Sequence, residues 1–443
     1  MIFSNVQTID CDFLETLKYL YFTRPYNTMK LGLFRIEQLL SRMGNPHSGI
    51  KYFHVTGSNG KGSVTTFLEY LTYSHGHSVS GFYSPHLATI LERFHHNTKL
   101  ISKDEFCSVA NYVRRFAEEM DKISEEFAPS FFEYMTAMYF YFSKLKGVEY
   151  GSTEVGLGGR FDSTNVIKPV VSIITTVSLE HTNVLGNTLE EIAFEKAGII
   201  KEGVPVVIGQ MPQEAKDVIY DVAKQKNAKI YEFGKDFSAE CVDYNFDKNT
   251  YNYYGESTLK NITVRLNGQH QLFNFAVALK AFELVENIAE NSVKKAFDNA
   301  FIPGRFEKVN DIILDGSHNP QAAKAFADNV SLYFPDSKKV ALFGIVDDKD
   351  KENVLRIIGP IFETIIITKP PSKRAQRVDE TFEIAKKYCT NVILEEDPIK
   401  GLKIVQEFND YVKFVTGSFY LVGFIRNFLN YGEISEELKL SLM

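Results

Sequence analysis

The 443-residue sequence predicts an α/β protein. Short β-branched or aromatic runs alternate with longer segments of helical period, a pattern typical of βα units around a largely parallel sheet. In addition, the glycine-rich segment HVTGSNGKGS (54–63) lies between such a run and a helical segment. At roughly 150 residues per domain, the length allows two or three domains.

In the first 300 residues, the pattern predicts strands at 52–56, 79–83, 150–155, 170–175 and 204–208. It predicts helices at 61–74, 104–120, 131–146, 271–285 and 292–299. The segment 236–266 differs, because alternating Tyr, Val and Thr are broken there by Asn, Asp and Gly. This segment is expected to form a β-hairpin or meander appended to the main sheet.

The segment Phe301 to Arg305 (FIPGR) is the best candidate for a linker, since a second alternating series follows it. Strands are predicted at 311–314, 340–343, 364–367, 391–394 and 411–415, with helices at 321–333, 351–358 and 419–430. We therefore expect an N-terminal domain at 1–302, which includes the hairpin region, and a smaller C-terminal domain at 303–443.

Composition excludes several classes of protein. With 49 Lys and Arg against 56 Asp and Glu, the net charge is −7, which disfavours a protein that binds nucleic acid or a membrane surface electrostatically. The apolar runs are far shorter than the ~20 residues that span a bilayer, and the N-terminus lacks a signal-peptide pattern. Four singly scattered cysteines indicate reduced thiols. We expect a cytoplasmic monomer with no nucleic-acid or membrane partner.

The segment 54–63 predicts a phosphate site. A turn between strand and helix presents backbone N–H groups and the helix N-terminus to an anion, and Lys61 adds a point charge for the β- and γ-phosphates. The strict P-loop pattern fails at Val55 and Gly62, which leaves a shifted variant around Gly57, Gly60 and Lys61. The alternative is a glycine turn that serves only the strand-to-helix geometry.

The segment EVGLGGRFDSTN (154–165) follows another predicted strand. A dinucleotide site is weakly supported, because Phe161 stands where the third glycine belongs. Glu154 at the carboxyl end of a buried strand suits Mg²⁺, with Arg160 and Asp162 in the same crevice. The alternative is a surface pair between Arg160 and Asp162 beside a capping Glu154.

Lys196 falls on the apolar stripe of a helix that opens with the capping box Thr188 to Glu191. A lysine on such a stripe must snorkel, pair with an acid, lose its proton or be chemically modified. Two more motifs precede helices. DGSHNP places Asp315 and His318 at a strand end, and NGQHQLFN offers amides suited to a nucleotide base, although both histidines could be ordinary loop residues.

Taken in order, the motifs resemble the dihydrofolate synthase/folylpolyglutamate synthase family of the Mur ligase superfamily. The motifs that carry the resemblance are HVTGSNGKGS, SPHL with ERF, PSFFEYMTA, EVGLGGRFDSTN, EHTNVLGNT, EKAGIIK, HQLFN, PGRFE, DGSHNP and TGSFYLVG. The resemblance implies a P-loop-type ATPase domain with a mostly parallel sheet, a smaller Rossmann-like glutamate ligase domain, and an active site between them.

The resemblance also implies residue roles. Lys61, His181 and Lys196 would be catalytic, and Lys196 would carry a carbamate. The Mg²⁺ ligands would be Ser84, Glu154 and His181. ATP would be bound by Ser58, Asn59, Gly60, Lys61, Gly62, Ser63, Asn274, Arg305, Asp315 and His318. The folate or pteroate site would comprise Lys30, Leu31, Gly32, Ser130, Phe131, Phe132, Glu133, Phe161, Asp162 and Ser163.

The implied reaction is ATP-dependent amide formation between L-glutamate and a folate or dihydropteroate, through an acyl phosphate, with release of ADP and phosphate. The sequence departs from the family at Ser58, where Thr is commoner, at Glu180, where Asp is usual, and after SPHL, where some relatives have Arg. Two alternatives stay open. A nucleotide switch could use the same loop, and a Mur-type ligase could act on a cell-wall precursor, although an ATP loop ~55 residues into the chain argues against the uridine-binding domain of the latter.

Overall fold

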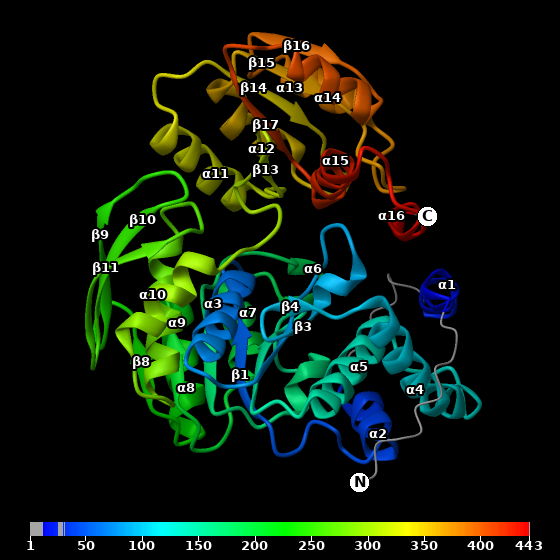
Figure 1. Cartoon of the computed structure of the whole chain (residues 1–443), viewed down its shortest axis with the longest axis vertical. Helices are drawn as coiled ribbons and strands as arrows, with labels where there is room; N and C mark the ends of the chain where they lie inside the picture. The colour runs from blue at the N-terminus through cyan, green and yellow to red at the C-terminus, as the bar shows by residue number, and fades with distance from the viewer. Residues whose placement is uncertain (1–11, 25–29, 31, 443) are drawn as a thin grey trace.

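The computed structural model describes residues 12–24, 30 and 32–442. Figure 1 shows two lobes, an N-terminal lobe (residues 12–300) and a C-terminal lobe (residues 304–432), joined by one connecting segment. The fold is α/β, as predicted, and each lobe is built around its own largely parallel sheet.

The sheet of the N-terminal lobe has eight strands in the order β4-β3-β2-β5-β1-β6-β7-β8. The six strands from β2 to β8 in this order pair parallel with one another, whereas β3 and β4 pair antiparallel at one edge. The strand bounds are β1 (Lys51–Thr56), β2 (Val79–Phe82), β3 (Phe94–His96), β4 (Lys99–Leu100), β5 (Tyr150–Glu154), β6 (Val171–Ile174), β7 (Val206–Ile208) and β8 (Ile230–Glu232).

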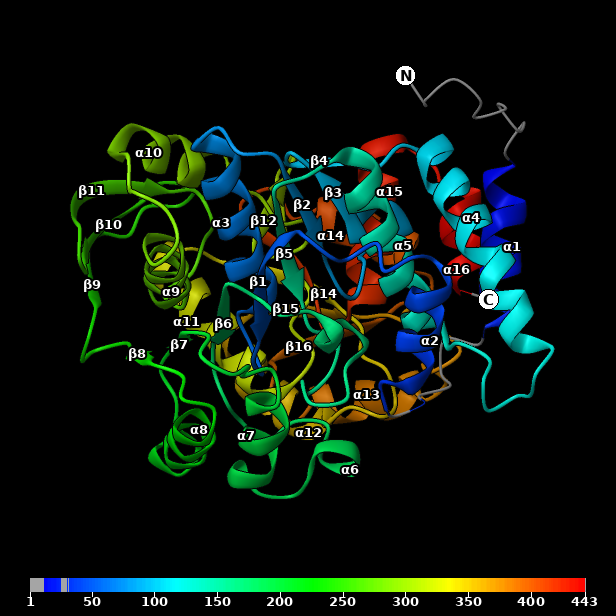
Figure 2. The same cartoon turned by 90° about the horizontal axis from the view of Figure 1, so that it is seen from below.

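Helices cover both faces of this sheet because successive side chains of a buried strand point to opposite faces. Tyr52 packs into the core that contains α1 (Phe13–Thr23), α2 (Phe34–Arg42), α4 (Lys103–Asp121) and α5 (Phe131–Lys146). The next residue, Phe53, packs into the core that contains α3 (Lys61–Ser74), α9 (Gln271–Glu283) and α10 (Glu290–Asn299). Figure 2 shows β1 between these two sets of helices. A third core, beside β6 and β7, holds α7 (Leu189–Ala197) and α8 (Gln213–Gln225).

The predicted meander is present, but it forms its own sheet. Strands β9 (Ser238–Asp243), β10 (Asn249–Tyr254) and β11 (Thr258–Val264) pair antiparallel in the order β11-β10-β9. The expectation that this segment is appended to the main sheet is wrong. Its apolar side chains, including Tyr251, Tyr253 and Ile262, pack into the core with α9 and α10, so the meander covers these helices instead of extending the eight-stranded sheet.

The C-terminal lobe contains a six-stranded sheet in the order β12-β13-β17-β14-β15-β16, with only β12 antiparallel to its neighbour. The strands are β12 (Glu307–Val309), β13 (Ile312–Asp315), β14 (Lys339–Phe343), β15 (Thr364–Ile367), β16 (Asn391–Leu394) and β17 (Val412–Thr416). One face is covered by α11 (Pro320–Tyr333), α12 (Lys351–Ile358) and α13 (Val378–Ala385), and the other by α14 (Pro398–Gln406) and α15 (Phe419–Tyr431). The Rossmann-like expectation is confirmed.

Within the described residues, every helix is too short or too polar to cross a bilayer. Cys241 and Cys389 are free thiols, as expected. Cys107 takes part in a disulfide bond, so the expectation of uniformly reduced thiols is wrong at that residue.

Candidate active site at the junction of the two lobes

The glycine-rich segment lies between β1 and α3, as predicted, and α3 begins at Lys61. Gly57 and Gly60 both have positive φ, +152° and +85°. A Cβ at Gly60 would come within 2.4 Å of Asn274 Oδ1, and one at Gly57 within 1.9 Å of Thr175 Oγ1. The glycines are thus required because two other segments approach the loop closely.

The loop is held from within and from the segment after β6. Lys61 Nζ donates to the carbonyl oxygens of Gly57 (2.7 Å) and Ser58 (3.3 Å). Ser58 Oγ accepts from the backbone N of Ser178 (2.9 Å), and the backbone N of Asn59 donates to Thr176 Oγ1 (2.9 Å). The loop is therefore braced by hydrogen bonds, and within the described residues its lysine is hydrogen-bonded to neutral carbonyl oxygens alone.

Glu154 ends β5, the strand beside β1, and only 5% of it is exposed. Its single hydrogen bond among the described residues comes from the backbone N of Ser84 (3.1 Å). Burial raises the pKa of Glu154 to about 7, although Lys61, the Ser84 N–H, Arg305 and Arg93 all favour the ionised form. Within the described part of the chain, this side chain is a desolvated carboxylate with no ion-pair partner.

Lys196 is buried in α7, with 1% exposed, and its Nζ lies 2.7 Å from Glu180 Oε1. Of the four options left open by the sequence, pairing with an acid is the one seen. Burial lowers the pKa of Lys196 to about 8 against the opposing effect of Glu180. Burial would raise the pKa of Glu180, but Lys196 and Lys61 outweigh it and hold that pKa below its usual value.

His181 caps the short helix α6 (Thr182–Leu185) in the left-handed conformation, φ +46°, and its side chain is exposed. Desolvation by the surrounding protein lowers the pKa of His181, and the ammonium groups of Lys349, Lys61 and Lys196 act in the same direction, against Glu180. Lys61 also acts on Glu154 and Glu180. The predicted phosphate, metal and modification residues are thus gathered around one lysine.

Of the predicted residues Arg305, Asp315 and His318, two lie against the ring of Phe419, Arg305 and His318. Asp315 ends β13, is 8% exposed, and accepts hydrogen bonds from the backbone N of Phe306 and of Ser317 (both 3.0 Å). The Arg305 guanidinium lies 4.7 Å from the centre of the Phe419 ring, and the His318 ring lies 5.2 Å from it. Burial raises the pKa of Asp315 and lowers that of His318 to about 4.

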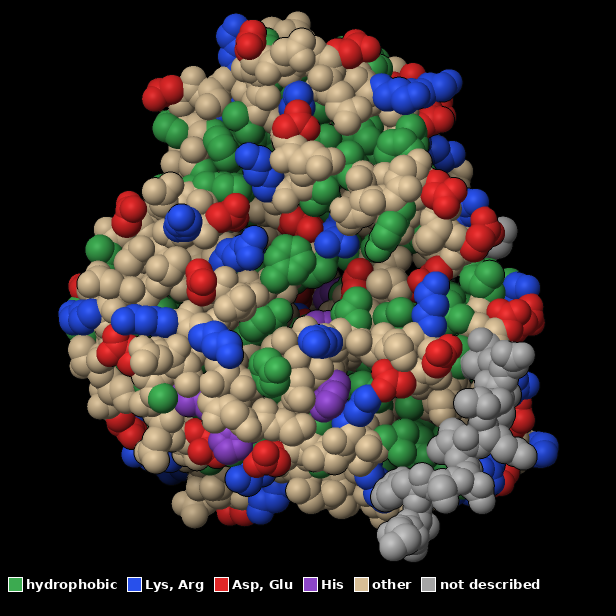
Figure 3. Space-filling view, in the orientation of Figure 1, with side chains coloured by type: hydrophobic (Ala, Val, Ile, Leu, Met, Phe, Trp, Pro, Cys, Tyr) green, Lys and Arg blue, Asp and Glu red, His purple; other side chains and the backbone are tan. Residues whose placement is uncertain are grey.

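Gln321, in the first turn of α11, joins the two lobes and was missed by the sequence analysis. Its Oε1 accepts hydrogen bonds from Asn59 Nδ2 and Ser178 Oγ, both at 2.6 Å. The partners are 262 and 143 positions away in the sequence. Only its position directly after DGSHNP hinted at a role. Figure 3 shows a hollow at this junction of the lobes.

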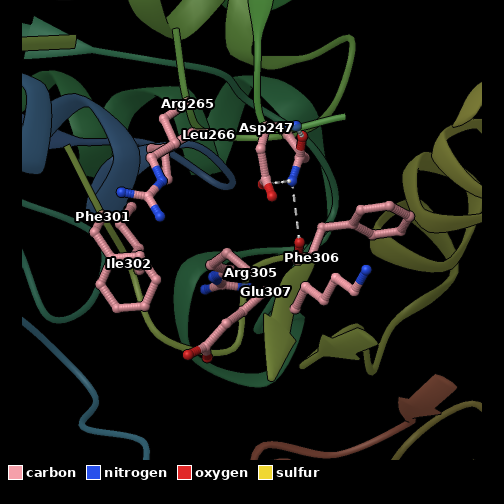
Figure 4. A pocket seen from close by; sticks show the side chains of 10 residues that line it. Asp247, Arg265, Leu266, Phe301, Ile302, Arg305, Phe306 and Glu307 are labelled. Carbon is pink, nitrogen blue, oxygen red and sulfur yellow. Dashed lines mark hydrogen bonds between the residues drawn. The ribbon is translucent and has the colours of Figure 1, made fainter. Parts of the chain in front are cut away.

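Two amide side chains of α9 lie beside the glycine-rich loop and the start of α3. Asn274 Nδ2 donates to Gln271 Oε1 (3.0 Å), and Gln271 Nε2 donates to Ser63 Oγ (3.2 Å). Beside this region, a small cavity of about 50 Å³ lies at the linker. Figure 4 shows Arg265 and Arg305 reaching toward it from the meander and from the linker.

The predicted folate residues fall into two groups. In the first group, the polar side chains already form hydrogen bonds or ion pairs with other parts of the protein. Lys30 Nζ donates to two backbone carbonyls, and Ser130 caps α5 in a capping box with Glu133, which also pairs with Arg35 (3.0 Å). Gly32 has a positive φ of +108°, and Leu31 lies outside the described residues.

The second group surrounds the segment after β5. Phe131 is buried, Phe132 packs against Gly156, and Ser163 Oγ is 2.6 Å from Thr136 Oγ1. Asp162 is buried and caps the turn that follows it, so burial raises its pKa. Arg160 forms an ion pair with Glu195 (2.5 Å) and covers the exposed ring of Phe161 (4.3 Å). The alternative of a surface pair between Arg160 and Asp162 is therefore wrong.

Two family models match most of the chain. Residues 128–282 match the Mur ligase middle domain, and residues 304–418 match the Mur ligase glutamate ligase domain. The dihydrofolate synthase/folylpolyglutamate synthase of Bacillus subtilis is 34% identical over 90% of this chain and 95% of that protein. The chain belongs to the dihydrofolate synthase/folylpolyglutamate synthase family. The resemblance seen in the sequence is confirmed.

Solved structures of this family agree over nearly the whole chain. Folylpolyglutamate synthase of Thermotoga maritima superposes with a TM-score of 0.88 at 40% identity, covering 96% of this chain and 99% of that one. The Mycobacterium tuberculosis enzyme, complexed with ADP and AMPPCP, has a TM-score of 0.87 at 26% identity, covering 94% and 99%. Escherichia coli FolC in complex with DHPP and ADP gives 0.84 at 25%, covering 96% and 99%. Like its family, the chain is an ATP-dependent ligase.

Proposed function

We propose that this chain joins L-glutamate to a folate, to dihydropteroate, or to both, through an acyl phosphate formed at the expense of ATP. The observation that carries the proposal is the convergence of the ATP loop, the Glu154–Ser84 contact and the Glu180–Lys196 pair around Lys61 at the junction of the lobes. The names of the relatives cover both acceptors, since some are called folylpolyglutamate synthase and others dihydrofolate synthetase.

ATP is expected to lie along the loop and to reach the C-terminal lobe. The N–H groups of residues 60 to 63, at the N-terminus of α3, would face the phosphates, since those of Ser58 and Asn59 already donate to Thr176. Lys61 exchanges its two carbonyl partners for phosphate oxygens, an exchange favoured because a charged acceptor bonds more strongly than a neutral one. Asn274 contacts the nucleotide from α9, and Arg305, Asp315 and His318 contact it from the other lobe.

Two of the three residues that the resemblance implies for magnesium, Ser84 and Glu154, lie together. The desolvated Glu154 carboxylate accepts one hydrogen bond and has free oxygen lone pairs, with Ser84 beside it. Within the described residues no three His, Cys, Asp or Glu side chains converge as a metal site, so Ser84, Glu154 and His181 would need phosphate and water oxygens to complete the six ligands of Mg²⁺. Bound there, Mg²⁺ would neutralise charge that develops on the transferred phosphoryl group.

The chemistry needs no nucleophile from the protein. The substrate carboxylate attacks the γ-phosphorus in line, ADP leaves, and the acyl phosphate that forms is a good electrophile. The amine of L-glutamate then attacks the acyl carbon, phosphate leaves, and the amine loses a proton as the amide forms. Lys61 stabilises charge on the phosphoryl oxygens, and closure of the lobes keeps water away from the acyl phosphate.

The two lobes would have different roles. We infer that residues 1–302 bind ATP and the folate and that residues 303–443 act as the glutamate ligase domain of a monomer. The two large sheets share no strand, and the linker 301–305 connects them. For the folate, we propose a pocket formed by Phe131, Phe132 and Phe161 with Asp162 and Ser163. Lys30, Ser130 and Glu133 would support its wall, because their polar groups are already hydrogen-bonded.

The decisive experiment is phosphate release from ATP in the presence and absence of L-glutamate and of either dihydropteroate or a reduced folate. We expect release to require glutamate together with at least one acceptor, and to match amide formation one to one. Testing each acceptor alone then shows whether one or both are used. Release that no such pair stimulates would contradict the proposal and favour a nucleotide switch.

Lys196→Ala is expected to be inactive and to recover part of its activity with acetate or formate. We propose that the neutral amine adds CO₂ and loses a proton to give a carbamate. With a pKa of about 8, roughly a tenth of the amine is neutral at pH 7. Small carboxylates would replace the carbamate anion in the space left by the side chain.

The matched control is Lys201→Ala, since Lys201 also has a pKa lowered by burial but donates to a neutral group, the carbonyl of Asn165 (2.8 Å). It should not respond to acetate. Full activity of Lys196→Ala in bicarbonate-free buffer would show that the carbamate is unnecessary.

A further inference from the structure

The last helix of the chain, α16 (Glu436–Leu442), returns from the C-terminal lobe to the N-terminal lobe. Figures 1 and 2 both show it beside α1, and the two helices are in contact. Leu438 is buried, and Leu440 packs against the core that contains α1 and α5. At its start, Ser435 is tied to the other lobe, because its backbone N donates to Asn427 Oδ1 in α15 (3.0 Å).

One side chain of α16 is hydrogen-bonded to segment 84–93, which connects Ser84 to β3. Glu437 Oε1 accepts from Thr89 Oγ1 (2.6 Å) and from the backbone N of Ile90 (2.8 Å). Glu437 is 9% exposed, so its hydrogen bonds are shielded from water. The neighbouring Glu436 is exposed and pairs only with Lys439 on its own helix (2.6 Å).

A series of hydrogen bonds connects Thr89 to Ser84 within segment 84–93. Thr89 opens a short 3₁₀ helix (Ile90–Arg93) in a capping box with Glu92, whose carboxylate also accepts from the backbone N of Leu87 (2.6 Å). Arg93, at the end of that helix, donates to Ser84 Oγ (3.4 Å) and to His86 Nδ1 (2.9 Å). Ser84 in turn donates its backbone N–H to Glu154.

The other side of the segment rests on the C-terminal lobe. Leu87 belongs to the core of that lobe, and a Cβ at Gly423 of α15 would lie 2.1 Å from the Leu87 carbonyl oxygen. Ile90 and Leu91 belong to a core of the N-terminal lobe. The segment therefore lies between the two lobes, and Glu437 fastens it at the point where it changes from one core to the other.

We propose that α16 is a strap, and that Glu437 is a positioning residue that holds segment 84–93 and thereby Ser84 in place for the phosphates and Mg²⁺. This inference rests on the proposed function only for what Ser84 binds. The hydrogen bonds of Thr89 and Ile90 to Glu437 are independent of it. Loss of the strap should loosen the segment without disturbing β1 or the ATP loop.

The test is hydrogen exchange of the full-length protein, read on peptides that cover 84–93, with β1 peptides as an internal reference. In Glu437→Ala we expect exchange at Ile90 and Leu91 to rise about tenfold, the factor for one lost hydrogen bond to a carboxylate. Exchange in β1 should stay unchanged. Glu437→Gln keeps an acceptor oxygen and should restore most of the protection, and Glu436→Ala should match the wild type.

Activity gives a second readout. In Glu437→Ala we expect the Mg²⁺ concentration for half-maximal phosphate release to rise about tenfold, with kcat at saturating Mg²⁺ within twofold of the wild type. Unchanged exchange at 84–93, or equal effects of Glu436→Ala and Glu437→Ala, would overturn the strap. If the wild type showed no glutamate-dependent phosphate release, the proposed function would be contradicted. The hydrogen-exchange result would then still test whether α16 acts as a strap.

Discussion

Lys61→Ala should lower kcat for glutamate-dependent phosphate release by about 10²-fold to 10³-fold, the cost typical of removing one preorganised group that stabilises transition-state charge. Lys61 is the residue around which Glu154, Glu180 and His181 gather, and it influences the pKa of all three. Its present partners are neutral carbonyls at 2.7 and 3.3 Å, so at about 1–1.5 kcal/mol for each hydrogen bond the loop loses about 2–3 kcal/mol of stabilisation when the amine is removed.

The measurement is steady-state kcat together with the affinity for a non-hydrolysable ATP analogue and the melting temperature. Lys99→Ala is the matched control, because Lys99 is exposed in β4 and its removal changes the net charge equally. We expect the control to behave as the wild type. If Lys61→Ala kept a tenth or more of the wild-type kcat, Lys61 would lose its proposed role in phosphoryl transfer.

Glu154→Gln should inactivate the ligase and yet stabilise the protein at pH 8 in the presence of EDTA. The folded chain holds the Glu154 proton up to a pKa of about 7, whereas the unfolded chain releases it near 4.5. Between these values the folded state binds more protons, so stability falls as pH rises, and the full penalty is present above about pH 7. The difference corresponds to about 3 kcal/mol, which the neutral amide avoids.

The measurement is urea unfolding at pH 5 and pH 8 without Mg²⁺. The variant should gain about 2–3 kcal/mol over the wild type at pH 8 and much less at pH 5, where the carboxyl group is already protonated in the folded chain. Glu202→Gln removes an exposed carboxylate and should show no such pH-dependent gain. A Glu154→Gln variant that is less stable than the wild type at pH 8 would contradict a desolvated, unpaired carboxylate at this site.

Local patterns predicted most of the individual elements. The strand before Gly57, the helix that begins at Lys61, and the capping box from Thr188 to Glu191 all form as the sequence indicates. These features depend on residues within one or two turns of each other, so neighbouring positions contain the necessary information. The meander also formed, but its packing on α9 and α10 did not follow from its alternation, because a strand pattern does not specify its partner.

The sequence by itself determined the α/β class, the order of motifs and the family, because each rests on short segments whose residue types and spacing suffice. Only the tertiary structure decided which polar side chains contact one another. Arg160 pairs with Glu195, Lys196 with Glu180, and Glu437 with Thr89, which is 348 positions away. Such pairings, and the desolvation that raises the pKa of Glu154, depend on segments brought together from distant parts of the chain, and no local pattern records that neighbourhood.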